Sequence, residues 1–313
     1  MSKKRREKTI ITASITGAIH TPSMSPYLPK GKDEIIQNAV DAWKAGAAIV
    51  HIHARKPVTG EPTSDLDYFR EILNGIKEQC NVVIGITTGG ALGMTVEERF
   101  AVLSEFQPEM ATCNAGTSNF VLSELTKTFD KPQFDWEEPF LLRTYDSFFK
   151  NTFADIEHAL TLMNEHRIRP EFEVFDLGQI NTVAYFRRKG LVKDPIYIQF
   201  VPGTLGGIPL SNDNITFMIK TAQQLLGSDI RYSLVGSGRR MFRAETFHVL
   251  QGGNVRVGME DSLYINIQGE LARNNAEQVT KIKSILELLD YEIASSDEAR
   301  EMLQLKGVDK VNF

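Results

Sequence analysis

Eight short apolar runs rich in β-branched residues alternate along this 313-residue chain with longer segments whose apolar residues recur at helical spacing. The candidate strands cover residues 9–18, 47–54, 81–90, 109–116, 171–178, 195–203, 229–238 and 254–261. Several are apolar on both faces, which is typical of parallel strands covered by helices. Eight successive β-then-α units predict a (β/α)8 TIM barrel forming one domain over residues 1–313. A doubly wound open sheet is the alternative, because counting strands does not separate the two folds.

Two segments lie outside this alternation. Residues 1–8 read as a basic tail that lacks the apolar stretch of a secretory signal. Residues 117–150 are long and aromatic, and we expect an elaborated connection after the fourth strand. A formal charge of −5 argues against a nucleic-acid partner, and no apolar run is as long as a membrane span. Cys80 and Cys113 form no Cys-x-x-Cys pair or disulfide framework, so the expectation is a cytoplasmic protein.

The ends of the predicted strands are crowded with polar side chains. In α/β barrels, binding and catalytic residues lie at the carboxyl ends of the strands and in the loops that follow. The ends carry, in chain order, Ile19, His20, His51, His53, Arg55, Thr87, Thr88, Gly89, Thr112, Asn114, Glu173, Ser237, Arg239, Arg240, Arg256, Glu260 and Asp261. This distribution predicts one functional site at the mouth of the barrel.

His51 and His53 are the most informative pair among these residues. Side chains at i and i+2 of a strand leave the same face, so two imidazoles can converge on one divalent cation. A catalytic zinc site uses three protein ligands and keeps a position open, and Glu260 is our candidate for the third ligand. The alternative is a pair of core histidines hydrogen-bonded to neighbours such as Glu173. His20, near the same mouth, is a ligand, a substrate contact or a loop anchor.

Glu260 and Asp261 place two carboxylates next to each other at the end of the eighth strand. Adjacent strand residues face opposite sides, so Asp261 approaches Glu260 only if the strand is already turning into its loop. There, an ionised Asp261 near Arg256 would be placed to act as a base. The alternative is a solvated strand end or a helix cap. Arg256 shares the face of Glu260 if the strand is regular, and a buried arginine needs an anionic partner.

Two glycine-rich turns, "TTGG" at 87–90 and "GSGRR" at 236–240, follow predicted strands. Such turns can present backbone N–H groups to an anion. The loops after the seventh and eighth strands are the usual phosphate-binding region of barrels, so Ser237, Arg239 and Arg240 are candidates to bind a phosphorylated ligand. Simple turn geometry is the alternative for both motifs.

Six segments together resemble the β-keto acid cleavage enzymes, the 3-keto-5-aminohexanoate cleavage enzyme family. They are "TASITGAIHTPSMSPYLP", "GAAIVHIHAR", "GITTGGALGMTVEERF", "PEMATCNAGTSNF", "YIQFVPGTLGG" and "NVRVGMEDSLY", in order between about Thr9 and Tyr264. The resemblance implies a zinc-bearing TIM barrel, usually a homotetramer. It also implies an exchange of acyl groups, in which a β-keto acid and acetyl-CoA give acetoacetate and a new acyl-CoA.

Matched motif by motif, the resemblance places zinc on His51, His53 and Glu260, and the base on Asp261 with Arg256 as its partner. Thr87 supplies the hydroxyl of the family's "STGG" motif, and Thr112 of "EMAT" completes the catalytic set. The expected substrate contacts are Ile19, His20, Thr88, Gly89, Asn114 and Glu173, and the expected coenzyme contacts are Arg55, Ser237, Arg239 and Arg240.

The chain departs from this family at one position. In the member that acts on the amino-substituted keto acid, a glutamate follows "TGA", whereas this chain has Ile19. A carboxylate can pair with an ammonium and isoleucine cannot, which argues against 3-keto-5-aminohexanoate itself as the substrate. The alternative is that Glu173 or Asp176 supplies the negative charge from the fifth strand. Two other functions stay open: a zinc aldolase or lyase that does not use CoA, and a non-catalytic barrel that binds a metal or senses a ligand.

Overall fold

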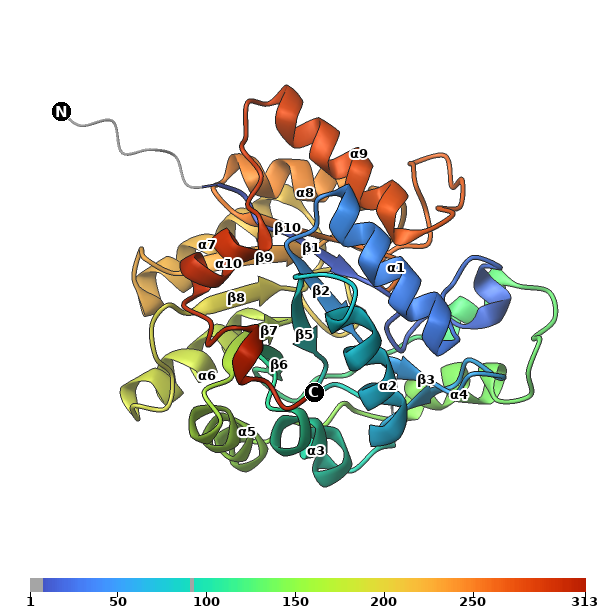
Figure 1. Cartoon of the computed structure of the whole chain (residues 1–313), viewed down its shortest axis with the longest axis horizontal. Coiled ribbons are helices and arrows are strands. Elements are labelled where there is room, and N and C mark those ends of the chain that lie inside the picture. Colours follow the sequence, from blue (N-terminus) through green and yellow to red (C-terminus); the bar gives the residue numbers. More distant parts are fainter. Residues whose placement is uncertain (1–7, 91–92) are drawn as a thin grey trace.

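Eight parallel strands close into a barrel in the order β1-β10-β9-β8-β7-β6-β5-β2 in the computed structural model, which describes residues 8–90 and 93–313 (Figure 1). The barrel strands are β1 (Ile11–Ser14), β2 (Ile49–Ile52), β5 (Val83–Ile86), β6 (Met110–Asn114), β7 (Arg169–Val174), β8 (Tyr197–Phe200), β9 (Arg231–Val235) and β10 (Asn254–Val257). The predicted (β/α)8 barrel is confirmed, and the open sheet is excluded because β1 pairs with both β2 and β10. Of the expected basic tail, only Lys8 lies within the described residues.

Helices surround the barrel and cover the outer face of its strands (Figure 1). They are α1 (Lys32–Ala45), α2 (Leu66–Lys77), α3 (Val96–Phe106), α4 (Glu137–Arg143), α5 (Phe153–Glu165), α6 (Leu177–Arg188), α7 (Asn212–Leu226), α8 (Met241–Leu250), α9 (Asn275–Leu288) and α10 (Ser296–Leu303). Their buried faces and the outward strand residues form the main hydrophobic core. Within residues 8–90 and 93–313, no helix combines the length and apolar character needed to cross a membrane.

A small hairpin and a long connection with its own short helices interrupt the alternation of strands and helices. The second predicted strand stops at Ile52, and β3 (Ala54–Arg55) then pairs antiparallel with β4 (Pro62–Thr63) in a small hairpin. Residues 117–150 lie between β6 and α5 and contain η2 (Ser123–Thr128), α4 and η3 (Thr144–Asp146). Three further 3-10 turns are η1 (Pro22–Met24), η4 (Gly238–Arg240) and η5 (Val308–Lys310).

The amino ends of the strands are closed by α10. Ile10, Val83 and Tyr197 near these ends pack in a second apolar cluster with Ala299 and Leu303 of the helix. In Figure 1 this helix, in red, crosses the barrel close to β8 and β9. With one end plugged by apolar side chains, the carboxyl ends of the strands are left to form a binding site.

The strand register brings the predicted site residues together. β1 lies between β2 and β10, with Ser14 paired to His51 and Thr12 paired to Arg256. The histidines at the end of β2 and the charged residues at the end of β10 are therefore separated by one strand only, although about 200 residues of sequence lie between them.

Candidate active site

The eighth barrel strand turns immediately before its two carboxylates. β10 ends at Val257, and Gly258 follows with a φ of +150°. The backbone N–H of Asp261 donates to the carbonyl of Gly258 (3.1 Å), and that of Glu260 donates to the carbonyl of Ser14 (3.2 Å). Because the strand has turned, Glu260 and Asp261 both reach the barrel mouth. The sequence analysis expected the two carboxylates to lie close together only if the strand turned before them.

His51, His53 and Glu260 converge on one point. The Nε2 atoms of His51 and His53 lie 3.6 and 3.5 Å from Oε1 of Glu260, beyond ordinary hydrogen-bond length. All three side chains are buried, and one donor atom from each lies within 4.8 Å of the others. Two ligands at about 2.1 Å from a tetrahedral zinc ion stand about 3.4 Å apart, so the observed spacing suits such an ion.

The electrostatics of the three residues also fit a divalent cation. Burial lowers the pKa of His51 to about 3, which keeps its imidazole in the neutral form that binds metals. Burial would raise the pKa of Glu260, but the charged Arg256 guanidinium, which donates to its Oε1, holds that pKa below its usual range while the His51 imidazole stays neutral. Among the described residues, Nδ1 of His51 and Oε2 of Glu260 are buried without a hydrogen-bond partner. A buried, ionised and half-satisfied carboxylate is costly unless a cation completes its surroundings.

Arg256 orients the two carboxylates. Its Nε and Nη2 donate to Oδ2 and Oδ1 of Asp261 (2.8 and 3.0 Å), and Nη2 also donates to Oε1 of Glu260 (2.7 Å). Its Nη1 donates to Oε1 of Gln199 (2.7 Å). Burial opposes the charge, yet Asp261 and Glu260 raise the pKa of Arg256 well above its ordinary value. The guanidinium is therefore a fixed cation that holds Asp261 through a bidentate pair.

Two further carboxyl groups lie beside Arg256 inside the barrel. Oε1 of Glu173 is 3.8 Å from Nη1 of Arg256, and Oε1 of Glu171 accepts a hydrogen bond from Nε2 of Gln199 (3.0 Å). Burial raises the pKa of Glu171 to about 7 and that of Glu173 to about 8. Four carboxyl groups thus lie at or near the Arg256 guanidinium, and the raised pKa values leave much of Glu171 and Glu173 protonated at neutral pH, so Glu260 and Asp261 are the main negative partners of the guanidinium.

Gly17 makes room for Glu260. It has a φ of +59°, and a Cβ added to it would lie 2.3 Å from Cγ of Glu260. Gly17→Ala is expected to displace the Glu260 carboxylate and weaken divalent-metal binding by about 10–100-fold, measured by competition with a chromophoric chelator. Gly190→Ala is the matched control, because Gly190 also has a positive φ (+79°) but nothing lies within 4 Å of its added Cβ. Equal metal affinity in the two variants would contradict this role of Gly17.

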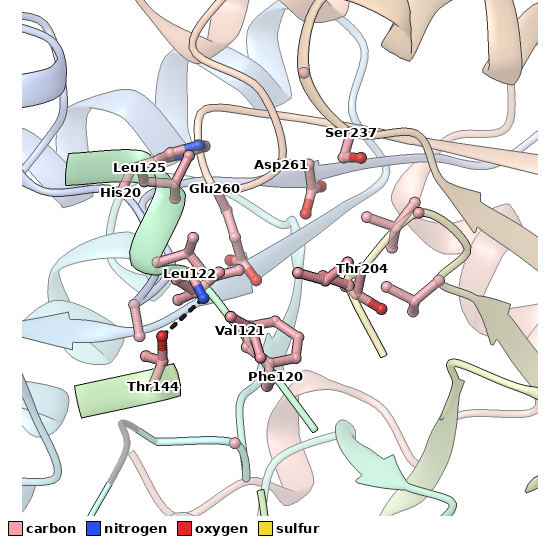
Figure 2. A pocket seen from close by; sticks show the side chains of 18 of the residues that line it. His20, Phe120, Val121, Leu122, Leu125, Thr144, Thr204, Ser237, Glu260 and Asp261 are labelled. Carbon is pink, nitrogen blue, oxygen red and sulfur yellow. Dashed lines mark hydrogen bonds between the residues drawn. The ribbon is translucent and has the colours of Figure 1, made fainter. Parts of the chain in front are cut away.

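His53, Glu173, Arg256, Glu260 and Asp261 lie at the floor of a cavity of about 500 Å³. Figure 2 shows Glu260 and Asp261 pointing into it, with His20 on one side and Ser237 and Thr204 on the other. The predicted site residues that line the cavity are Ile19, His20, His53, Thr87, Gly89, Asn114, Glu173, Ser237, Arg256, Glu260 and Asp261. His20 anchors its loop as well, because its Nδ1 donates to the carbonyl of Met259 (2.8 Å) and burial lowers its pKa to about 4.

The polar residues of the third and fourth strand ends divide into two groups. Asn114 lines the cavity, is 3% exposed, and has no hydrogen-bond partner within the described chain for either amide atom. Thr87 also lines the cavity, and its Oγ1 accepts from the N–H of Gly89 (2.9 Å). Thr88 and Thr112 lie behind them and bond to each other: Thr88 N–H donates to Oγ1 of Thr112 (2.9 Å), and Thr88 Oγ1 donates to the carbonyl of Thr112 (2.8 Å). Thr88 and Thr112 are not among the described residues that line the cavity, and the substrate contact of Thr88 and the catalytic role of Thr112 stay predictions.

Of the three arginines expected to contact the coenzyme, one is buried and two are exposed. Arg55 is 1% exposed, and its guanidinium donates to the carbonyls of Gly60, Thr16 and His20 at 2.8–2.9 Å. It ties the loop after β1 to the β3–β4 hairpin inside the protein, and its contact with coenzyme phosphates stays a prediction. Arg239 and Arg240 are exposed, and the guanidinium of Arg239 lies over the ring of Tyr264, which lines the cavity.

Sequence reasoning missed Ser14 and gave Gln199 no role. Ser14 Oγ lies 2.5 Å from Oδ2 of Asp261, to which it donates, and Gln199 bridges Arg256 and Glu171. A signal for Ser14 existed, because Thr12, Ser14 and Thr16 alternate in the first strand and so face the barrel interior together. Gln199 is a polar residue in an otherwise apolar strand, which is the corresponding signal there.

Comparison with known proteins places this chain in a family. A sequence model of the beta-keto acid cleavage enzyme family matches residues 8–305. The 3,5-dioxohexanoate:acetyl-CoA acetone transferase of Paraburkholderia graminis is 47% identical over 313 residues, covering 100% of both chains. The 3-keto-5-aminohexanoate cleavage enzyme of Fusobacterium nucleatum is 36% identical over 301 residues, covering 96% of this chain and 99% of the relative.

Among solved structures, the ternary complex of ObcA with C4-CoA adduct and oxalate superposes with a TM-score of 0.68 at 19% identity. The superposition covers 90% of this chain and 68% of that one, and it shows a shared barrel fold. The family match and the two relatives extend over nearly the whole chain. This chain therefore belongs to the beta-keto acid cleavage enzyme family.

Proposed function

We propose that this chain condenses a β-keto acid with acetyl-CoA and releases acetoacetate and a new acyl-CoA, with a zinc ion held by His51, His53 and Glu260. One observation carries the proposal: three buried metal-type donors converge beside a carboxylate that an arginine and a serine hold in place. The related proteins whose names include acetyl-CoA support the choice of coenzyme. The homotetramer and the cytoplasmic location stay predictions.

The first step is the removal of a proton from C2 of the β-keto acid. When bound, the zinc ion supplies Lewis acidity, which lowers the pKa of the C–H bonds between the two carbonyl groups. Asp261 takes the proton, and Arg256 and Ser14 fix the direction of its carboxylate through hydrogen bonds of 2.5–3.0 Å. Because the base is aligned before substrate enters, little reorganisation is needed during transfer.

The carbon–carbon steps then balance without an added oxidant or reductant. The C2 carbanion attacks the thioester carbon of acetyl-CoA, so that a C–C bond forms and the C–S bond breaks. The released CoA thiolate attacks the C3 carbonyl, the C2–C3 bond breaks, and Asp261 returns the proton to acetoacetate. Thr87 and the unpartnered amide of Asn114 line the cavity and are placed to donate to oxygens that gain charge.

Basic residues beside the cavity are suited to the phosphates of the coenzyme. The Arg239 guanidinium lies over the ring of Tyr264, which lines the cavity. On its other side Arg239 lines an open hollow of about 430 Å³ together with Arg243 and Lys281. Arg240 is exposed in the same turn, η4. These side chains keep their charge at the surface and can pair with phosphate groups without the cost of burial.

Asp261→Asn tests the proposed function at its first step. The variant should keep its metal and lose deuterium exchange at C2 of a β-keto acid, because asparagine preserves the shape but has no basic carboxylate. Exchange measured by NMR should fall by about 10²–10⁴-fold. Undiminished exchange would assign the base to another residue.

Labelled acetyl-CoA separates this proposal from its two alternatives. The proposed reaction moves the acetyl label into acetoacetate, detected after chromatography. An aldolase or lyase would cleave the β-keto acid at the same rate with or without the thioester. A non-catalytic barrel would bind metal and consume neither compound.

A further inference from the structure

The cavity has two chemically different regions. Its floor, at the strand ends, holds Glu173, Arg256, Glu260 and Asp261, together with the His53 imidazole. These groups are suited to the carboxylate and keto ends of a β-keto acid. The rest of the substrate, the R group on the far side of the keto carbon, must therefore extend away from the floor.

One wall above the floor is apolar. It is formed by Phe120, Val121, Leu122 and Leu125, which we call the apolar wall. In Figure 2 Leu122 and Leu125 lie on the side of His20, whereas Thr204 and Ser237 lie on the opposite side, beyond Asp261. Since the exposed arginines of η4 follow Ser237, the coenzyme fits the second side and the R group fits the apolar wall.

Packing fixes the base of the apolar wall. The Phe120 ring lies 5.7 Å from that of Phe175 and 6.4 Å from that of Phe149. Phe120 also packs against the buried cluster of Phe175, Val201 and Val235. This base is anchored on the ends of three barrel strands and their loops.

Thr144 and the backbone N–H groups of Leu122 and Leu125, which belong to the segment of the apolar wall, are already paired. Thr144 Oγ1 accepts from the N–H of Leu122 (2.8 Å) and donates to the carbonyl of Leu141 (2.6 Å). The N–H of Leu125 donates to the carbonyl of Leu122 (2.9 Å). These groups have little capacity left to solvate a charge on a ligand.

Charge is absent from the apolar wall itself. Within the described residues of 117–150, Glu124 is the one charged side chain that lines the cavity. Its carboxylate pairs with Lys127, and its side chain is 71% exposed, so it is directed to solvent. An ammonium or carboxylate on the R group would lose its water against the apolar wall and gain no partner there.

We propose that the β-keto acids taken by this chain have an uncharged R group, an alkyl or keto-alkyl chain that packs on Phe120, Val121, Leu122 and Leu125. The proposal rests on the proposed function and narrows its substrate class. R groups that carry an ammonium or a carboxylate are rejected.

A panel of three β-keto acids of equal chain length tests the proposal on the unmodified protein: 3-oxohexanoate, 5-amino-3-oxohexanoate and 3-oxoadipate, each with acetyl-CoA. Acetoacetate release should give a kcat/KM for 3-oxohexanoate at least about a hundredfold above both charged compounds. A charged compound that equals or exceeds 3-oxohexanoate would overturn the inference and leave the proposed function intact. If the protein turns over none of these three compounds and does not turn over 3,5-dioxohexanoate either, the proposed function is overturned and this inference with it.

Leu125 allows a matched test of the apolar wall. It is half-buried in η2, so a polar side chain can be accommodated there. Leu125→Glu should raise the ratio of kcat/KM for 5-amino-3-oxohexanoate to that for 3-oxohexanoate by about tenfold or more, since it supplies a partner for the ammonium. Leu125→Gln, of the same size without the charge, should leave this ratio within about twofold of the unmodified protein. Equal ratios in the two variants would contradict the placement of the R group.

Discussion

His51→Ala is expected to abolish both the binding of the divalent cation and turnover. His51 is 1% exposed, its Nε2 faces Glu260 at 3.6 Å, and burial keeps its ring neutral by lowering the pKa to about 3. Removing it leaves His53 and Glu260, which is one ligand fewer than a catalytic zinc site uses. Lewis acidity contributes several kcal/mol to such reactions, and each 1.36 kcal/mol is tenfold, so kcat/KM should fall by on the order of a thousandfold or more.

Metal content measured by mass spectrometry after dialysis, together with acetoacetate release, checks this result. His158→Ala is the control, because His158 is exposed on α5 and does not line the cavity. The control should retain metal and activity. A His51→Ala protein with full metal occupancy would refute the ligand assignment.

Arg256→Met is expected to impair stability as well as activity. Arg256 is 2% exposed and donates to Asp261, Glu260 and Gln199, so its loss leaves buried carboxylates without their counter-charge. Breaking a buried ion pair by removing one partner costs about 3–5 kcal/mol, and we expect the free energy of unfolding in urea to fall by about that amount. Turnover should fall by at least about a hundredfold, because Asp261 loses the bidentate pair that orients it.

Arg188→Met is the matched control, since Arg188 is exposed at the end of α6 and its removal should change the free energy of unfolding by less than about 0.5 kcal/mol. If Arg256→Met unfolded at the same urea concentration as this control, the buried carboxyl groups around Arg256 would not need its guanidinium as a counter-charge for the protein to stay folded. The electrostatic account of the site would then be wrong.

The barrel and its metal-type donors were predictable from sequence because both depend on short-range patterns. Apolar runs alternating with helical periodicity predict the strands, and a two-residue spacing places His51 and His53 on one face. Glu260 and Asp261 are adjacent in sequence, so both side chains can reach one site only if the strand turns before them. Gly258, with its positive φ, makes that turn. The sequence showed that a turn was needed but not that it occurs there.

The contacts that sequence reasoning did not foresee depend on long-range packing. Arg55 looks like a surface cation in sequence, yet the carbonyls that bind it come from positions 16, 20 and 60 and meet only in the folded protein. Thr88 and Thr112 bond to each other because β5 and β6 are neighbours in the barrel. The apolar wall arises from residues 117–150, whose pairing with the cavity no periodicity predicts.

The central claim is that one divalent cation is held by His51, His53 and Glu260 at the barrel mouth. Crystals of the zinc-loaded protein, with diffraction recorded on both sides of the zinc absorption edge, test it most directly. The account predicts an anomalous peak at about 2.0–2.2 Å from a nitrogen of each imidazole and an oxygen of the carboxylate. The three side chains turned away from one another, with no peak among them, would contradict it.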